Sequence, residues 1–536
     1  MAKDKLWLGV WLLSAAAGLI IFVLFFNDAF PIASIDIRLS KKEVLEKAAE
    51  FVTAQGFSLE GFDETVLFDS DYSASVYLQK TQGIKKANTL IREGIPVWFW
   101  RVRWFKELNK DGFSVYVDPA SGKIINFEYS LLDNDQGENL SPEHARAKAQ
   151  DYLVARGFSL DDFELKDSTT KKQKNRTDYY FIWQKKDYSI QDANLRLAVF
   201  IYGDKLGYYS RYLDIPEEFL RDLGKEVSFG QVLSIIPMVF IFFIVIAAVF
   251  VLIVEFKKDK INWKFGLVFA VCVVALAVFS FLNSMPLLWS SYPDTMSKAV
   301  FITIACAGAL ISGLLFGLLI FLFGCSGESL ARGLWPEKFS FLGLRKYKGI
   351  NPANIMPSVV VGYSLGFIFL GYVTLFYLIG TKFFHIWMPP EVEYSNILGT
   401  TMPFLFPLTI AASAAVSEEF MFRLFTISFF KRYTKQIWLG VLVSSVIWAF
   451  AHSNYPVFPA YVRGIELTVA GIVFGIVFLK YGLASVLIGH FVIDAALVGL
   501  PLLKSHNAYF ISSGVIVVAL ALSPVFVFGL LAYRKK

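Results

Sequence analysis

Long apolar segments almost free of charge recur along the chain. The first, residues 6–26, has no charge over 21 residues, which is enough to cross ~30 Å of hydrocarbon. Nine more follow, at about 233–254, 265–282, 299–324, 357–380, 402–430, 437–452, 464–479, 483–501 and 510–532. The pattern predicts a polytopic α-helical membrane protein with about ten transmembrane helices, the first of which is a signal anchor that stays attached.

The polar region between the first and second spans has a different pattern. Residues 40–62 align without gaps on residues 141–163, at an offset of 101 residues. Each copy has a Ser at a plausible helix N-cap, apolar residues at helical spacing and a Gly-Phe pair at the end. Strand-like runs follow the helices, at 96–105, 113–119, 179–183 and 195–202. We therefore expect an inserted α+β domain built from an internal repeat.

The turn at residues 118–124, between two strand-like pieces, resembles the closing hairpin of PepSY-type modules. These are small α+β units found beside peptidases and in cell-envelope proteins. The resemblance gives two PepSY-like repeats, at about 40–130 and 141–215, although the second turn, near 203–209, is degenerate. Because the domain is covalently linked to the membrane helices, we expect it to bind or restrain peptides, and the alternative is a folded spacer without a ligand.

The basic residues set the expected orientation. An even number of spans puts both termini on one side, together with the more basic loops. These bases are Lys3, Lys5, Lys257, Lys258, Lys260, Arg332, Lys338, Arg345, Lys346, Lys348, Lys431, Arg432, Lys435, Lys480, Arg534, Lys535 and Lys536. We predict that this side is cytoplasmic, that residues 30–228 are extracytoplasmic, and that the protein is a multi-pass cell-membrane protein of bacteria.

The predicted organisation has five parts. They are an N-terminal anchor (1–29), the extracytoplasmic domain (30–228), non-catalytic helices (229–395), a chemically equipped core (396–505) and a C-terminal helix with a basic tail (506–536). Composition agrees with a membrane protein, since 55% of the residues are hydrophobic, 18% are charged and the mean hydropathy is +0.52. The expected partners are the lipid bilayer and a membrane-associated protein or peptide substrate, with no nucleic acid.

Cysteine usage narrows the chemistry. Cys272, Cys306 and Cys325 all fall in or at the end of spans, and the inserted domain has none. This excludes a disulfide-stapled exported domain and argues against a cysteine zinc site.

Ionisable residues gather in one quarter of the chain. The centres of the first five spans have none, whereas residues 402–500 carry Glu418, Glu419, Arg423, His452, His490 and Asp494. Each charge inside a membrane helix costs ~2.5–3.5 kcal/mol on insertion scales, so such groups usually face a protein interior or a water-filled cavity. The sequence therefore predicts a polar intramembrane site between helices.

Spacing suggests how these side chains pair. Glu419 and Arg423 are four residues apart and can form a buried ion pair on one helix face, which could also be purely structural. Glu418 is rotated by roughly 100° and should meet a different environment. His490 and Asp494 are also four apart, so the carboxylate can orient the imidazole. Arg463 and Glu466, at the start of a span, are expected to be interfacial charges.

Three motifs carry a family resemblance. Glu-Glu-Phe-Met-Phe-Arg at 418–423 looks like EExxxR, Trp-Ala-Phe-Ala-His at 448–452 like FxxxH with Trp for Phe, and His-Phe-Val-Ile-Asp at 490–494 like HxxxN/D. In this order, each on its own span, they resemble the CPBP family of intramembrane proteases. That family includes type II CAAX prenyl endopeptidases and bacteriocin-processing or immunity proteins, and the resemblance covers roughly 400–500.

The resemblance implies an intramembrane endopeptidase that cleaves membrane-associated substrates with glutamate-activated water. Glu418 would be the general base, His452 its partner on the water, and His490 with Asp494 would stabilise the oxyanion. Glu419 and Arg423 would hold the geometry, although the two glutamates could exchange roles. Either no cofactor or a single divalent metal such as zinc is expected, held by His452, His490 and Glu418; the chain has no HExxH motif.

Two other classes of function stay open. Intramembrane Glu, His and Asp also relay protons in proton- or ion-coupled transporters, which often show inverted repeats of their spans. No such symmetry is visible, because the charges lie in the second half only. The third possibility is a non-catalytic scaffold that binds peptides through the inserted domain.

Overall fold

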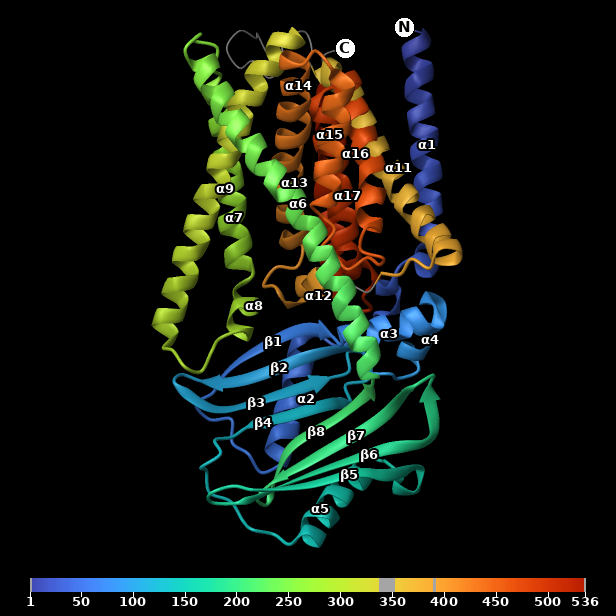
Figure 1. The fold of residues 1–536 in the computed structure, drawn as a ribbon, viewed down its shortest axis with the longest axis vertical. Coiled ribbons are helices and arrows are strands. Elements are labelled where there is room, and N and C mark those ends of the chain that lie inside the picture. The colour runs from blue at the N-terminus through green and yellow to red at the C-terminus, as the bar shows by residue number, and fades with distance from the viewer. Residues whose placement is uncertain (1, 337–351, 389–391, 535–536) are drawn as a thin grey trace.

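A computed structural model of the chain describes residues 2–336, 352–388 and 392–534. It consists of a helical bundle with a sheet domain at one end (Figure 1). Within the described ranges, nine helices are long and apolar enough to cross a membrane, and the remaining predicted span is the shorter helix α15 (Ile437–Phe450). The prediction of a polytopic helical membrane protein is confirmed, with one span shorter than expected.

The bundle is formed by elements from the start of the chain and from residue 217 onward. They are α1 (Ala2–Ala29), α6 (Glu217–Phe256), α7 (Trp263–Asn283), α8 (Met285–Ser290), α9 (Lys298–Leu334), α11 (Pro352–Phe384), α12 (Val392–Gly399), α13 (Leu405–Glu418), η3 (Glu419–Ile427), α14 (Ser428–Tyr433), α15, α16 (Val462–Tyr481), α17 (Leu483–Lys504) and α18 (Ala508–Arg534).

The inserted domain contains eight strands and six helical segments among its described residues. They are η1 (Pro31–Ser34), α2 (Lys41–Ala54), β1 (Asp63–Ser70), α3 (Tyr72–Gln82), α4 (Ile84–Arg92), β2 (Trp98–Lys106), β3 (Asn109–Val117), β4 (Ile124–Ser130), α5 (Pro142–Ala155), η2 (Leu160–Asp162), β5 (Phe163–Lys172), β6 (Thr177–Ile190), β7 (Ala193–Tyr202) and β8 (Lys205–Asp214).

The strands form one antiparallel sheet in the order β1-β2-β3-β4-β8-β7-β6-β5. Each repeat therefore supplies a helix and a four-stranded meander, and the last strands of the two repeats pair, with Phe127 opposite Tyr209. Both halves of the sheet domain thus contain the same order of helix and strands, at the positions of the predicted repeat. Helices α3 and α4 interrupt the first copy alone and were not predicted.

The two repeat helices begin and end as their sequences indicate. Ser40 and Glu43 form a reciprocal capping box at the start of α2, and Ser141 accepts a hydrogen bond from the His144 N–H at the start of α5. Gly56 and Gly157 follow the helices with φ of 85° and 83°, a left-handed conformation that glycine adopts at little cost.

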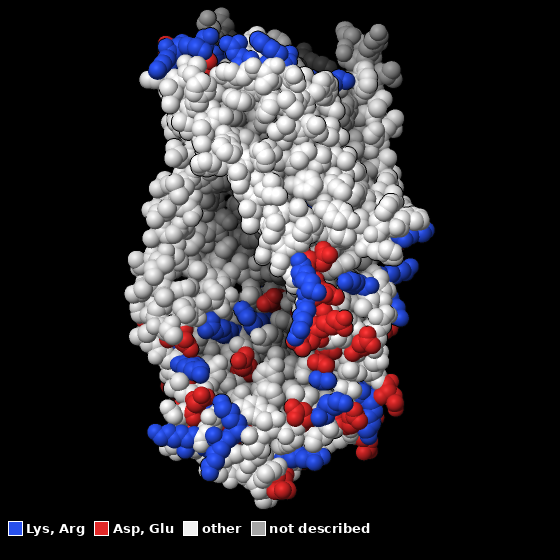
Figure 2. Space-filling model, viewed as in Figure 1, with Lys and Arg blue, Asp and Glu red and all other residues white. Residues whose placement is uncertain are grey.

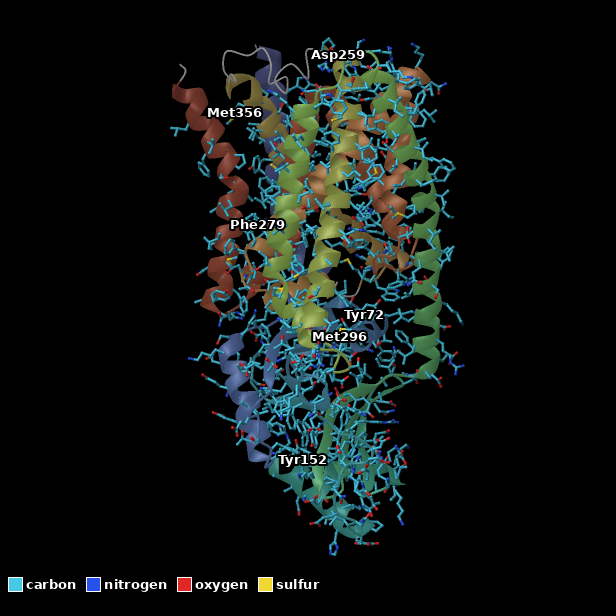
Figure 3. All side chains as sticks on the ribbon, turned by 90° about the vertical axis from the view of Figure 1, so that its left-hand side faces the viewer. Tyr72, Tyr152, Asp259, Phe279, Met296 and Met356 are labelled. Atoms are coloured by element: carbon cyan, nitrogen blue, oxygen red, sulfur yellow. The ribbon has the colours of Figure 1, made fainter. Side chains whose placement is uncertain are left out.

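Charge separates the two ends of the molecule. Figure 2 shows a broad uncharged belt with lysine and arginine side chains at one end and the mixed-charge sheet domain at the other. Both chain ends lie at the basic end of the bundle (Figure 1), where Asp259 and Met356 are also found (Figure 3). An even number of spans, as predicted, likewise puts both termini on the same side. Lys338, Arg345, Lys346, Lys348, Lys535 and Lys536 lie outside the described residues.

The N-terminal helix packs closely into the bundle. A Cβ atom on Gly18 of α1 would lie 2.4 Å from the Phe367 carbonyl oxygen of α11, and one on Gly371 would lie 2.5 Å from the Cα atom of Gly18. Small residues allow helix backbones to approach in this way inside membranes. The first span is thus packed tightly against α11.

The sheet domain is joined to the bundle by hydrogen bonds to its loops. Lys41 Nζ donates to the carbonyl oxygens of Gly399 and Thr400, at 2.9 and 2.6 Å. The N–H of His506 donates to the Ile37 carbonyl at 2.9 Å. These contacts fix the orientation of the first repeat relative to α12 and the α17–α18 loop.

Lys41 should make this junction sensitive to pH. Burial lowers the pKa of Lys41 to about 8 from 10.5, so between these values the unfolded chain holds a proton that the folded chain has released. Stability then rises with pH across this window. Between pH 7.5 and 9.5 we expect the thermal midpoint of the parent to rise by roughly 2–4 °C more than that of Lys41→Met, the shift that ~1 kcal/mol gives in a domain of this size.

The matched control is Lys42→Met, because the Lys42 side chain is 84% exposed. Thermal unfolding of the detergent-solubilised chain measures all three proteins. Equal pH dependence in the parent and the Lys41 variant would contradict the assignment.

Candidate active site

The predicted ionisable residues converge inside the bundle. Helices α11, α13, α15, α16 and α17 enclose a cavity of about 140 Å³, and its lining includes Glu418, His452, His490 and Asp494. The volume admits a few water molecules, each of which occupies ~30 Å³ in the liquid. Glu419 and Arg423, the other two predicted residues, lie behind the cavity wall.

The glutamate pair stands where the helix changes its winding. Helix α13 ends at Glu418, and the chain continues as the π-helix η3. Such widened turns are rare and often occur at functional sites. Neighbouring helices hold η3 from behind: Phe420 stacks on Phe265 of α7, and Leu424 packs against Gly327 of α9, where a Cβ atom would come within 2.9 Å.

Glu419 is the centre of a buried network. Its side chain is 0% exposed, and its Oε1 lies 2.9 Å from Arg423 Nη1 and 2.8 Å from His490 Nδ1. The predicted pair with Arg423 is confirmed. The bond to His490, which joins η3 to α17, was not predicted, because spacing within one helix says nothing about a partner on another.

Arg423 is also surrounded by aromatic rings. Its Cζ lies 4.3 Å from the centre of the Trp448 ring and 5.2 Å from that of Phe474. Aromatic faces attract a cation, and the attraction grows when the site is desolvated. The guanidinium is thereby stabilised from two sides besides its carboxylate.

Glu418 faces the cavity with 24% of its side chain exposed. Its Oε1 lies 3.9 Å from His452 Nε2, and its Oε2 lies 3.7 Å from His490 Nε2. The indole N–H of Trp448 donates to Oε2. The two adjacent glutamates are therefore not equivalent, as the spacing predicted.

Both histidines turn the same nitrogen toward Glu418. His452 Nδ1 lies 2.7 Å from the Trp448 carbonyl oxygen, and His490 Nδ1 lies against the Glu419 carboxylate. Because those oxygens accept, each Nδ1 carries a proton. The two Nε2 atoms point at Glu418 from 3.7–3.9 Å, too far for a direct hydrogen bond, and a water molecule beside them can contact all three groups.

Asp494 completes the wall on the α17 side. Its Oδ2 lies 3.4 Å from His490 Nε2, and its side chain is 26% exposed. The predicted approach of the carboxylate to the imidazole is confirmed. With Glu418, it gives the cavity two carboxylates on either side of one imidazole nitrogen.

The prediction that Arg463 and Glu466 are interfacial charges is wrong. Glu466 is 0% exposed. Its carboxylate accepts hydrogen bonds from Arg463 at 2.9 and 3.1 Å and from the Tyr377 hydroxyl at 2.7 Å. Arg463 lines the same cavity as Glu418. The sequence did contain an indication of this ion pair, because residues three apart on a helix lie close enough to pair.

The donor types would suit zinc, which binds His nitrogen and carboxylate oxygen. His490 also has a carboxylate on its other nitrogen, as zinc-bound histidines often do. Among the residues that the structure describes, however, no three His, Cys, Asp or Glu side chains converge closely enough to hold a metal ion. The residues do not fit a metal as they stand, and the chemistry below uses side chains alone.

Comparison with known proteins agrees with the motifs. Residues 400–496 match the family model described as type II CAAX prenyl endopeptidase Rce1-like. This segment is similar to that family. The resemblance predicted from the three motifs is thus confirmed for this part of the chain, and the family is one of proteases; no comparison supports the PepSY-like repeats.

One curated relative extends over almost the whole chain. The sporulation-killing factor biosynthesis protein SkfC of Bacillus subtilis (strain 168) is 22% identical over 505 residues, which cover 93% of this chain and 96% of the relative. The similarity therefore includes the sheet domain as well as the Rce1-like segment. No solved structure matches the chain.

Removing the buried cation should destabilise the bundle. We expect Arg423→Met to cost roughly 3–5 kcal/mol, because Glu419 keeps a carboxylate inside the protein without its main counter-charge. Arg432→Met, at the exposed end of α14, is the control and should change stability by less than about 0.5 kcal/mol. Thermal unfolding in detergent measures both, and equal midpoints would contradict a stabilising network.

Proposed function

We propose that the protein is an intramembrane endopeptidase that hydrolyses peptide bonds of membrane-associated proteins or peptides. The observation that carries the proposal is the convergence of Glu418, His452 and His490 on one small cavity inside the helical bundle. The match of this segment to a protease family supports it.

The proposed reaction starts with a water molecule held by Glu418 and the two Nε2 atoms. Glu418 accepts a proton from the water as its oxygen attacks the carbonyl carbon of the substrate. The carbonyl oxygen becomes an oxyanion, which His490 stabilises through its Nε2–H; in this step the ring is protonated on both nitrogens, with Nδ1–H on Glu419 and Asp494 orienting the ring. When the C–N bond breaks, Glu418 returns its proton to the leaving amine.

Glu419 has a positioning role in this proposal. Its bond to His490 Nδ1 fixes the ring so that Nε2 faces the cavity, and the ion pair with Arg423 holds the Glu419 carboxylate in place to accept that bond. Glu418 is the better base because it is the glutamate that reaches the cavity. Arg463, which lines the same cavity and is paired with Glu466, can donate to substrate backbone oxygens.

The proposed topology places both termini in the cytoplasm. The basic end of the bundle then faces inward, and the sheet domain, with its PepSY-like repeats, lies outside a bacterial cell. The name of the SkfC relative refers to the biosynthesis of a killing factor. A secreted or membrane-associated peptide is accordingly a reasonable substrate class for this chain, too.

The decisive variant is Glu418→Gln. It keeps the size of the side chain and a hydrogen-bond acceptor for Trp448 but cannot accept the proton, so cleavage should fall by at least ~100-fold. Quantitative membrane proteomics of cells with the variant in place of the parent should show accumulated uncut proteins. Glu217→Gln, at an exposed position 78% open to solvent, is the matched control.

The same comparison separates the proposal from its alternatives. A transporter or a peptide-binding scaffold would leave the pattern of cut membrane proteins unchanged in Glu418→Gln at equal expression. Such a result would refute the protease assignment. Adding a chelator to the parent in the same assay shows directly whether a metal ion takes part.

Trp448 should act on the base through its N–H. Trp448→Phe keeps a ring over Arg423 and loses the donor to Glu418 Oε2. A hydrogen bond to a charged group contributes ~1.5–3 kcal/mol, so we expect kcat on an identified substrate to drop by about 10- to 100-fold with little change in KM or thermal midpoint. An unchanged kcat would show that the indole N–H does not position Glu418.

A further inference from the structure

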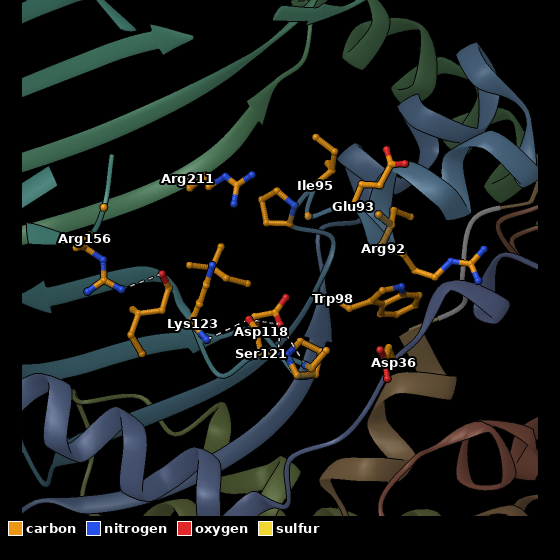
Figure 4. Close-up of a pocket in the computed structure, with 18 of the residues that line it drawn as sticks. Asp36, Arg92, Glu93, Ile95, Trp98, Asp118, Ser121, Lys123, Arg156 and Arg211 are labelled. Atoms are coloured by element: carbon orange, nitrogen blue, oxygen red, sulfur yellow. Dashed lines mark hydrogen bonds between the residues drawn. The ribbon is translucent and has the colours of Figure 1, made fainter. Parts of the chain in front are cut away.

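A second and much larger cavity lies in the sheet domain. It has a volume of about 790 Å³, within the ~300–1,000 Å³ typical of ligand sites. Figure 4 shows that segments from both repeats form it: the end of α4 and the following loop, the turn between β3 and β4, the end of α5, and β8. The cavity thus exists only because the two repeats are joined in one sheet.

The lining is charged and unevenly paired. It contains five basic residues, Arg38, Arg92, Lys123, Arg156 and Arg211, against three acidic ones, Asp36, Glu93 and Asp118. Most are already engaged within the domain. Asp36 is bonded to Arg38 and His506, and Asp118 accepts from the N–H groups of its own turn.

Arg156 is also engaged, because it donates to the Ile124 carbonyl and lies over the Tyr209 ring. Three charged side chains of the lining have no such partner. Neither the guanidinium of Arg211 nor the ammonium of Lys123 has a hydrogen bond or ion pair in the described ranges. Glu93 is likewise unpaired there. Figure 4 places the Arg211 guanidinium between Arg156 and the segment that carries Glu93 and Ile95.

We propose that this cavity binds a short peptide with a free carboxyl end, whose carboxylate pairs with Arg211. A guanidinium matches a carboxylate with two parallel hydrogen bonds. Glu93 on the facing segment can hold an amine of the same peptide, and Trp98 supplies an apolar surface. The site is distinct from the intramembrane cavity and does not depend on catalysis there.

The mixture of signs favours a peptide over a phosphate group. The side chains without a partner are two cations, Arg211 and Lys123, and one anion, Glu93. A ligand with a carboxylate and an ammonium can offer an opposite charge to both kinds, whereas a dense dianion would repel Glu93. The volume is also far larger than a phosphate needs. A lipid headgroup is therefore the competing occupant, and the experiment below includes it.

The test uses the full chain in nanodiscs of zwitterionic lipid. The probes are a pool of random pentapeptides with free carboxyl ends, the same pool as C-terminal amides, and glycerol phosphate as the soluble headgroup. Hydrogen exchange of residues 92–96 and 118–125 reports binding at the cavity. We expect the acid pool to protect these segments, with at least tenfold weaker binding of the amide pool.

Arg211→Gln should weaken the acid pool by at least tenfold without lowering the thermal midpoint, because the guanidinium makes no hydrogen bond or ion pair with the described residues. Arg146→Gln, which removes an exposed arginine from α5, should bind like the parent. Glu418→Gln should also bind like the parent, so failure here is distinguishable from failure of the protease proposal. Equal protection by acid and amide pools, no effect of Arg211→Gln, or stronger protection by glycerol phosphate would overturn the inference.

Discussion

The buried carboxylate of Glu419 is the interaction on which the bundle centre depends. It is fully enclosed and holds both Arg423 on its own helix and His490 on α17. A charge without a partner at this depth would cost several kcal/mol, so the two contacts must form together for the helices to pack. The aromatic rings beside Arg423 exclude water and strengthen both contacts.

This network explains how two adjacent glutamates come to differ. The Glu419 carboxylate binds Arg423 and His490 and so holds two helices together. Glu418, one position earlier on the helix, faces a different direction and points into the cavity. The π-helix begins at this point, and α7 and α9 pack against its outer face. The wide turn therefore separates a structural carboxylate from an accessible one within a single dipeptide.

The sequence predicted contacts between residues close together on one helix and missed the contacts between helices. The pairs Glu419–Arg423 and His490–Asp494 follow from helical spacing alone. The bond from Trp448 to Glu418 depends on how α15 packs, and no spacing encodes that. The sequence prediction for Glu466 was wrong because the end of a span is exposed only when nothing covers it, and here Tyr377 and Tyr372 of α11 contact this residue.

The orientation of the histidines shows what the fold contributes to chemistry. A backbone carbonyl fixes His452, and Glu419 fixes His490, so that both rings present Nε2 to the same carboxylate. Trp448 occupies one oxygen of Glu418 and leaves the other beside His452. The groups thus meet at one point before any substrate arrives, and this preorganisation saves the reaction the cost of arranging them. A water molecule at that point would meet Glu418 Oε1, the carboxylate oxygen that Trp448 leaves free to accept its proton.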